Sequence, residues 1–243
     1  MLLQITTSAW TDFLSQLSGL ASDPICRGKG VPHGDGQPVL LIPGFTAGDW
    51  SLRPMARWLA RVGYKPYFSG IDLNVGCPQR KVELVGWRLE QIVEGSGAPV
   101  VIIGHSLGGV LGRAIASIYP EHVRRVIAIG SPLRMHWDVV RDEVRPAMLA
   151  MQGFWQNFRR APRDCGTDLC GCGFADSVRD LSSSIRKFDS IFTREDEVVD
   201  WRECVGDGVA AHEVSGGHVG LIVNPHVYRL VASILAQDTP VVA

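Results

Sequence analysis

The residues with the clearest chemical potential lie in the stretch 100–110, which reads VVIIGHSLGGV. A continuously apolar run rich in β-branched residues leads into a Gly-x-Ser-x-Gly motif, and an amphipathic segment follows at once. This strand–turn–helix context predicts a turn that exposes the hydroxyl of Ser106 as a nucleophile. Gly104 and Gly108 would remove collisions with neighbouring elements. The helix that begins after Ser106 would point its first amides toward the reacting oxygen and favour negative charge there.

A serine nucleophile needs a general base, and the chain offers seven histidines. Only His218 follows a strand-like run and a flexible Gly-Gly pair just before the last predicted helix, in HEVSGGHVGL. A loop there would let the imidazole reach back to Ser106, so we expect His218 to be the base. His212 and His226 are the alternatives. His105, inside the motif, is interpreted as a packing or supporting residue.

Short apolar runs alternate with amphipathic segments along the chain, which is typical of a parallel sheet covered by helices. The expected strands are three clear ones and two weaker ones, at 38–42, 99–103, 126–129, 64–69 and 188–193. Apolar residues at steps of three and four predict helices over about 55–62, 82–93 and 227–235. We therefore expect a single domain over residues 1–243, without repeats or linkers.

Two segments depart from this alternation. The N-terminal stretch carries Trp10, Phe13, Leu14 and Leu17 at helical spacing. It could lie on a membrane surface, but its few basic residues favour packing against the domain. The segment of about 133–187 is rich in aromatic residues and methionine, and it contains no clean strand.

An insertion of that length between two strands predicts a cap or lid over an active site. Its apolar side chains would suit an acyl chain, although they could also form the cap's own small core.

Composition excludes several classes of protein. With 46% apolar residues, 20% charged residues and a formal net charge of −1, the chain gives no electrostatic reason to expect nucleic acid as a partner. We find no secretory signal at the start and no apolar run of the length that a transmembrane segment needs. We therefore expect a soluble and cytoplasmic protein.

Cysteines form the only cluster that suggests a metal. Cys165, Cys170 and Cys172 crowd into a glycine-rich stretch, but three thiols without a nearby histidine fit a structural zinc site poorly. We expect no metal. A local disulfide, or a link from this stretch to Cys77 or Cys204, is more plausible, and free thiols remain an alternative.

The strand–GHSLG–helix unit resembles that of the α/β-hydrolases, and the chain is similar to compact bacterial lipases and esterases from Pro38 to Leu235. The resemblance implies an α/β-hydrolase fold, that is, a mainly parallel, twisted sheet with helices on both faces. It also implies no cofactor and hydrolysis through a covalent acyl-enzyme.

The resemblance also indicates an oxyanion hole. One donor would be the amide of Leu107, and the other would be the amide of Phe45 in LIPGFT, with Thr46 as a possible helper. Pro43 stands where the family more often has histidine, which leaves the amide donor unaffected. Alternatively, this loop is simply a tight turn, and Asp49 caps the helix that follows; both can be true.

The acid should lie between the serine and the histidine in the chain. The run SIFTREDEVV resembles the family's strand followed by Asp-x-x-Val, which selects Asp196 as the partner of the base. Glu195, Glu197 and Asp200 are rivals in the same acidic loop. Asp138 is the candidate if the acid instead follows the preceding strand.

These residues predict a carboxylic-ester hydrolase of esterase or lipase type, acting on a small-molecule acyl ester or a lipid. A thioesterase or an acyltransferase would use the same triad, because the pocket selects the acceptor. A non-catalytic binding protein on this scaffold is disfavoured, because all three triad positions are present.

Overall fold

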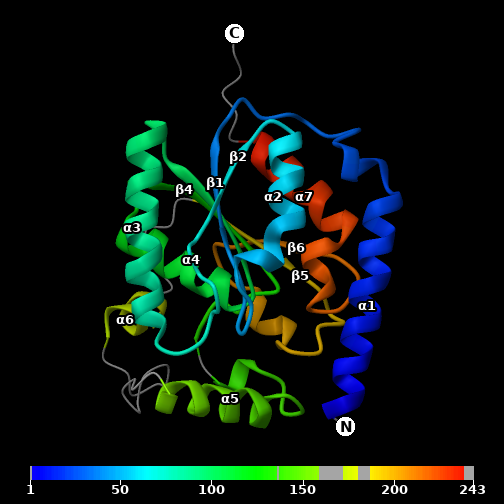
Figure 1. Cartoon of the computed structure of the whole chain (residues 1–243), viewed down its shortest axis with the longest axis vertical. Helices are drawn as coiled ribbons and strands as arrows, with labels where there is room; N and C mark the ends of the chain where they lie inside the picture. Colours follow the sequence, from blue (N-terminus) through cyan, green and yellow to red (C-terminus); the bar gives the residue numbers. More distant parts are fainter. Residues whose placement is uncertain (1, 136, 159–171, 180–186, 238–243) are drawn as a thin grey trace.

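A computed structural model describes residues 2–135, 137–158, 172–179 and 187–237 (Figure 1). In this part of the chain, six strands form one sheet in the order β2-β1-β3-β4-β5-β6. Every neighbouring pair is parallel. The strands are β1 Pro38–Ile42, β2 Lys65–Phe68, β3 Val100–His105, β4 Val123–Ile129, β5 Phe188–Phe192 and β6 Ala210–Glu213. The three clear and two weaker strand predictions are confirmed.

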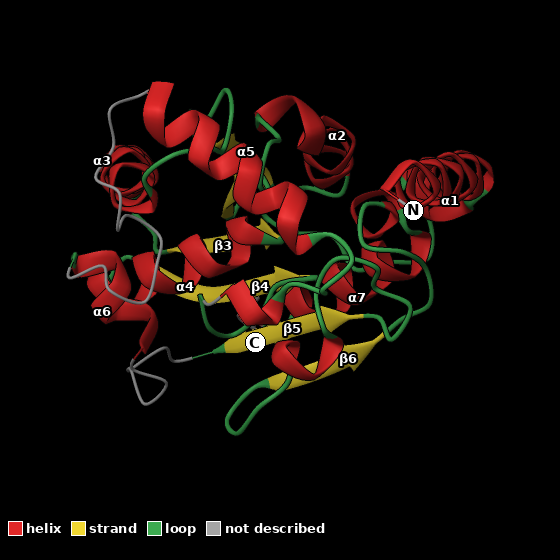
Figure 2. Ribbon diagram, turned by 90° about the horizontal axis from the view of Figure 1, so that it is seen from below, coloured by secondary structure: helices red, strands yellow, loops and turns green. Residues whose placement is uncertain are grey.

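Helices cover both faces of the sheet, as predicted. They are α1 Leu2–Ser22, α2 Arg53–Arg61, α3 Pro78–Ser96, α4 Leu107–Ile118, α5 Arg145–Phe158, α6 Gly173–Arg179 and α7 Pro225–Ala236. Side chains of a strand alternate between its faces, so β1 contributes Val39 and Leu41 to one apolar cluster and Leu40 and Ile42 to another. The first cluster packs under α2 and α7, and the second under α3, α4 and α6. Figure 2 shows these two groups of helices on opposite sides of the sheet.

The N-terminal helix α1 packs on the domain, as its pattern predicts. Phe13 and Leu17 contact the cluster beneath α2 and α7, whereas Trp10 and Leu14 are exposed. No helix in the described residues has both the length and the hydropathy of a membrane span.

The segment between β4 and β5 divides into two parts with different surroundings. Helix α5 lies across the end of the sheet, below the strands in Figure 1. Helix α6 packs against α3 and α4, and its Phe174 and Val178 are buried in their cluster. The second half of the predicted cap therefore contributes to the body of the domain through α6.

The described residues include Cys77 and Cys204, the two cysteines predicted as disulfide partners of the glycine-rich stretch. Cys26, Cys77 and Cys204 are free thiols, and no group of three or more potential metal ligands is found among the described residues. Cys165 and Cys170 lie outside the described residues.

A buried charge network joins the last three strands of the sheet. The guanidinium of Arg125 in β4 forms an ion pair with the carboxylate of Asp189 in β5, and both side chains are nearly inaccessible to solvent. The other carboxylate oxygen of Asp189 lies 3.1 Å from Nε2 of His212 in β6. His212, an alternative base in the sequence, is thus engaged in this network.

We expect Asp189→Ala to lower the free energy of unfolding by about 3–5 kcal/mol, because it removes the carboxylate that faces a buried guanidinium. Urea unfolding followed by circular dichroism would measure the change. The matched control is Asp207→Ala, since Asp207 is exposed and should shift stability by less than about 0.5 kcal/mol. Equal unfolding midpoints for the two variants would contradict a stabilising role of the network.

Candidate active site

Ser106 occupies a strained turn between β3 and α4. Its backbone has φ 52° and ψ −125°, and a positive φ is uncommon for a residue with a side chain. Two hydrogen bonds fix the turn: the Ser106 amide donates to the carbonyl of Ile129 at 2.8 Å, and the Ser131 hydroxyl donates to the Ser106 carbonyl at 2.6 Å. Ser131 was not identified from the sequence, where a serine after an apolar strand carries no distinctive signal.

The glycines around Ser106 allow the backbone segments to approach closely. A Cβ atom at Gly104 would lie 2.3 Å from the carbonyl oxygen of Gly108, and one at Gly108 would lie 2.2 Å from that of Ile42. Both distances are far below a possible contact. The prediction that these glycines prevent collisions is confirmed.

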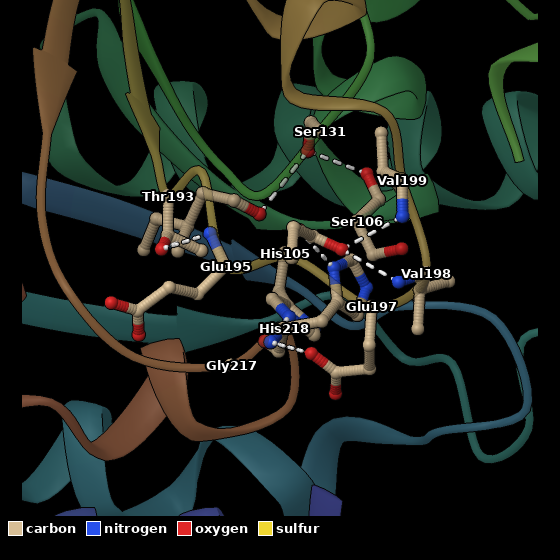
Figure 3. A network of polar contacts seen from close by, with 12 residues as sticks. His105, Ser106, Ser131, Thr193, Glu195, Glu197, Val198, Val199, Gly217 and His218 are labelled. Carbon is tan, nitrogen blue, oxygen red and sulfur yellow. Dashed lines mark hydrogen bonds and ion pairs between the residues drawn. The ribbon is translucent and has the colours of Figure 1, made fainter. Parts of the chain in front are cut away.

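His218 lies in the loop before α7, and a carboxylate holds its ring. The Nδ1–H group of His218 donates to Oδ2 of Asp196 over 2.7 Å, and both side chains are buried. The other oxygen of Asp196 accepts from the amides of Val198 at 2.8 Å and Val199 at 2.7 Å. Figure 3 shows Ser106, His105 and His218 grouped around these contacts. This arrangement leaves Nε2 as the ring nitrogen of His218 that Asp196 does not use.

The rival acids have other partners or positions. Glu195 and Glu197 accept backbone amides of the loop that carries His218, at 2.9 Å and 2.8 Å. Asp200 caps a 3₁₀ helix by accepting from the amide of Arg202. Asp138 is exposed in the 3₁₀ helix Trp137–Val139. Among the four carboxylates of the acidic loop, Asp196 is the one whose oxygen meets the imidazole.

Two buried histidines, His105 and His218, lie side by side, and their pKa values shift in opposite directions. The rings of His105 and His218 are 4.9 Å apart, and His105 Nε2–H donates to the backbone carbonyl of His218 at 3.0 Å. Burial and the neighbouring His218 lower the pKa of His105 to about 3. Burial also lowers the pKa of His218, but the charge and hydrogen bond of Asp196 and the charge of Glu197 outweigh it, so the pKa is raised above 6.5.

An apolar pocket opens next to Ser106. Its volume is about 470 Å³, including space open to solvent. Its walls come from the loop after β1, from α4, from the acidic loop and from the segment before and within α5. The lining residues are Phe45, Ser106, Leu107, Val110, Pro132, Met135, Val139, Val140, Met148, Val198 and Val199. The predicted oxyanion residues thus border the same pocket as Ser106.

The loop after β1 is held in a fixed shape. The Thr46 amide donates to the carbonyl of Asn74 at 3.0 Å, and the Asn74 side chain donates to the carbonyl of Pro43 at 2.7 Å. The Thr46 hydroxyl donates to the Phe45 carbonyl at 2.7 Å, which commits it to a local contact. Within the described residues, the amides of Phe45 and Leu107 donate to no protein acceptor. Two N–H groups are therefore available beside the pocket.

The predicted capping role of Asp49 is wrong. The short 3₁₀ helix Asp49–Leu52 has Gly48 at its N-cap, and no side chain caps it. A Cβ atom at Gly48 would lie 2.0 Å from the carbonyl of Asp72, so this position favours glycine. Asp49 instead accepts from the hydroxyl of Ser69 at 2.7 Å and the amide of Gly70 at 2.8 Å, which ties down the loop after β2.

Comparisons with known proteins agree with this architecture. Residues 85–199 match the family model described as alpha/beta hydrolase fold. A soluble variant of monoglyceride lipase from Saccharomyces cerevisiae, solved in complex with a substrate analog, superposes with a TM-score of 0.61 at 13% identity. That match covers 86% of this chain and 91% of the yeast chain. The chain therefore has the fold of the α/β-hydrolases.

Two curated relatives, both named triacylglycerol lipase, match part of the sequence. The protein from Burkholderia plantarii is 28% identical over 141 residues, which cover 52% of this chain and 39% of the relative. The protein from Pseudarthrobacter phenanthrenivorans is 32% identical over 107 residues, which cover 40% and 33%. The matches therefore span well under half of the length of these lipases.

The two neighbouring histidines make a prediction that does not depend on activity. We expect NMR titration to show His218 losing its proton above pH 6.5, while His105 stays neutral down to about pH 3, since the two pKa values shift in opposite directions. Nitrogen-15 shifts of the imidazoles would follow each ring, and His105→Gln would assign the signals. A His105 ring that titrates near pH 6.5 would contradict the buried, neutral state.

Proposed function

We propose that this chain is a carboxylic-ester hydrolase of esterase or lipase type, with Ser106 as nucleophile. The observation that carries the proposal is the combination of a strained, pocket-facing Ser106 with the buried pair of His218 and Asp196. A serine hydroxyl is a weak nucleophile until an adjacent base removes its proton, and a base works best when a third group orients it. The names of the curated lipase relatives support the same class of activity.

The proposed reaction follows from the positions of these groups. Nε2 of His218 takes the proton of Ser106 as its Oγ attacks the ester carbonyl, and Asp196 stabilises the resulting imidazolium. The amides of Phe45 and Leu107 donate to the oxyanion, each contributing about 3 kcal/mol to the lowering of the barrier. His218 then protonates the leaving alcohol. Water, activated by the same histidine, releases the acid and restores Ser106.

The pocket favours an apolar acyl group. Valine and methionine side chains dominate its walls, including Val110, Val140 and Met148. An acyl chain would bury its methylene groups there, at about 0.8 kcal/mol for each. The substrate class is therefore a small acyl ester or a lipid, with the segment around α5 acting as the cap over the acyl chain.

We expect the protein to hydrolyse p-nitrophenyl acyl esters, and Ser106→Ala to lower kcat by about 10⁴-fold or more, because no other group replaces the attacking oxygen. A series from acetate to palmitate would locate the preferred chain length. An acyl thioester and an alcohol acceptor in the same assay would reveal thioester hydrolysis or acyl transfer.

Ser15→Ala is the matched control, since Ser15 is exposed on α1. A wild-type protein that hydrolyses none of these substrates and resists a fluorophosphonate label at Ser106 would refute the proposed activity.

We expect kcat/KM to rise with pH through an apparent pKa above 6.5, because the base must be neutral and the pKa of His218 is raised. Asp196→Asn should lower kcat by about 10⁴-fold and move the midpoint to lower pH, since it removes the charge that favours the imidazolium. Asp200→Asn serves as control in the same loop, because asparagine also caps a helix. An Asp196→Asn enzyme with the wild-type rate and pH profile would show that Asp196 does not orient the base.

A further inference from the structure

The loop that carries His218, residues 215–219 and here called the base loop, is held through its backbone by carboxylates. Among the described residues, three successive amides of this loop each donate to a different acidic side chain. The pairs are Gly216 with Glu195 at 2.9 Å, Gly217 with Asp12 at 3.0 Å, and His218 with Glu197 at 2.8 Å. Hydrogen bonds to ionised acceptors are about twice as strong as neutral ones, so these contacts restrain the loop firmly.

One of these carboxylates comes from a remote element. Glu195 and Glu197 flank Asp196 in the acidic loop, so they connect two parts of the same site (Figure 3). Asp12 belongs to α1 and precedes Gly217 by 205 residues. The N-terminal helix therefore contacts the base loop directly, although no residue of α1 borders the pocket beside Ser106.

The fit between α1 and the base loop depends on small residues. A Cβ atom at Gly220 would lie 2.1 Å from Oδ2 of Asp12, and one at Gly216 would lie 2.8 Å from Nε2 of Gln16. Gln16 also donates to the other oxygen of Asp12 over 3.4 Å, which orients the carboxylate toward the loop. Phe13 and Leu17, on the same helix, pack into the domain core and fix α1 against the sheet.

His218 is consequently restrained by its ring, its amide and its carbonyl. The ring bonds Asp196, the amide bonds Glu197, and the carbonyl accepts from His105 at 3.0 Å. Asp12 adds the restraint on the preceding peptide unit. Reactive groups must stay within about 0.5 Å of their productive geometry, and a shift of about 1 Å can cost 10²-fold in rate. Movement of the peptide at Gly217 would be transmitted to the imidazole.

We propose that Asp12 is a positioning residue, through which helix α1 sets the location of the base His218. This inference rests on the proposed hydrolase function. Asp12 does not line the pocket beside Ser106, and it acts by holding the amide of Gly217. The N-terminal helix is thereby part of the catalytic framework.

The test compares two substitutions of Asp12 that differ in whether the new side chain can accept a hydrogen bond. Asp12→Asn keeps an oxygen that can accept from the Gly217 amide, whereas Asp12→Ala removes it. We expect Asp12→Ala to lower kcat roughly 10- to 100-fold with KM unchanged. We expect Asp12→Asn to retain most of the wild-type kcat. A p-nitrophenyl ester of the preferred chain length is the substrate.

A matched control loosens the same N-terminal segment without touching the base loop. Asp23 follows α1 and pairs with Arg229 of α7 over 2.7 Å, so Asp23→Ala weakens the attachment of this segment at its other end. We expect Asp23→Ala to keep the wild-type kcat even where its unfolding midpoint falls. An Asp12→Ala enzyme with wild-type kcat would overturn the proposal. Equal losses of kcat and stability in Asp12→Ala and Asp23→Ala would overturn it too, because Asp12 would then be only an anchor.

A second readout does not depend on turnover. The Nδ1 proton of His218, which is bonded to Asp196, should give a low-field NMR signal in the wild-type protein. We expect Asp12→Ala to shift or broaden this signal and Asp23→Ala to preserve it. A protein that lacks esterase activity but shows this difference refutes the proposed function and supports the positioning by Asp12. An active enzyme whose signal is identical in Asp12→Ala refutes the positioning alone.

Discussion

The positive φ of Ser106 is the constraint on which the surrounding structure depends, because neighbouring elements must hold the backbone in this conformation. Its positive φ costs about 1–3 kcal/mol and persists only where neighbouring elements determine it. Here the central strand β3 ends in the turn, α4 begins immediately after it, and glycines let the segments approach to distances that side chains would forbid. The carbonyl of Ile129 and the hydroxyl of Ser131 complete the restraint. A parallel pair of buried strands is what places those two groups beside the turn.

The parallel sheet also explains how distant segments assemble into one site. Parallel strands end at the same edge, so the loops after β1, β3, β5 and β6 converge there. These loops carry Phe45, Ser106, Asp196 and His218 respectively. Helix α5 lies across this edge and adds apolar walls to the pocket. The location of the site is thus a consequence of strand direction, and its polar groups border an apolar pocket that α5 helps to line.

The two buried histidines have pKa values that shift in opposite directions, because different groups face their rings. The ring of His105 bonds a backbone carbonyl, and within the described residues no hydrogen bond joins it to a carboxylate, so burial keeps it neutral. His218 faces Asp196, which stabilises its charged form despite similar burial. A neutral His105 can hold the carbonyl of His218 at any pH near neutrality. His218 can therefore change its charge while His105 stays neutral.

The sequence alone determined five of the six strands of the described sheet, three of the helices and the turn at Ser106, because period, β-branching and glycine spacing are local properties of a chain. The sixth strand, β6, was not among the predicted strands. The sequence also ranked His218 and Asp196 first among their rivals. The neighbouring carboxylates Glu195 and Glu197 have similar chemistry to Asp196, and the folded backbone alone decides which of the three points at the imidazole. Only the tertiary structure shows that Glu195 and Glu197 bond the backbone of the base loop. It also shows that Asp49 bonds the loop after β2 instead of capping a helix, and that Asp12 of α1 bonds the amide of Gly217. Contacts between segments that are far apart in the chain leave no local pattern, so folding alone decides them.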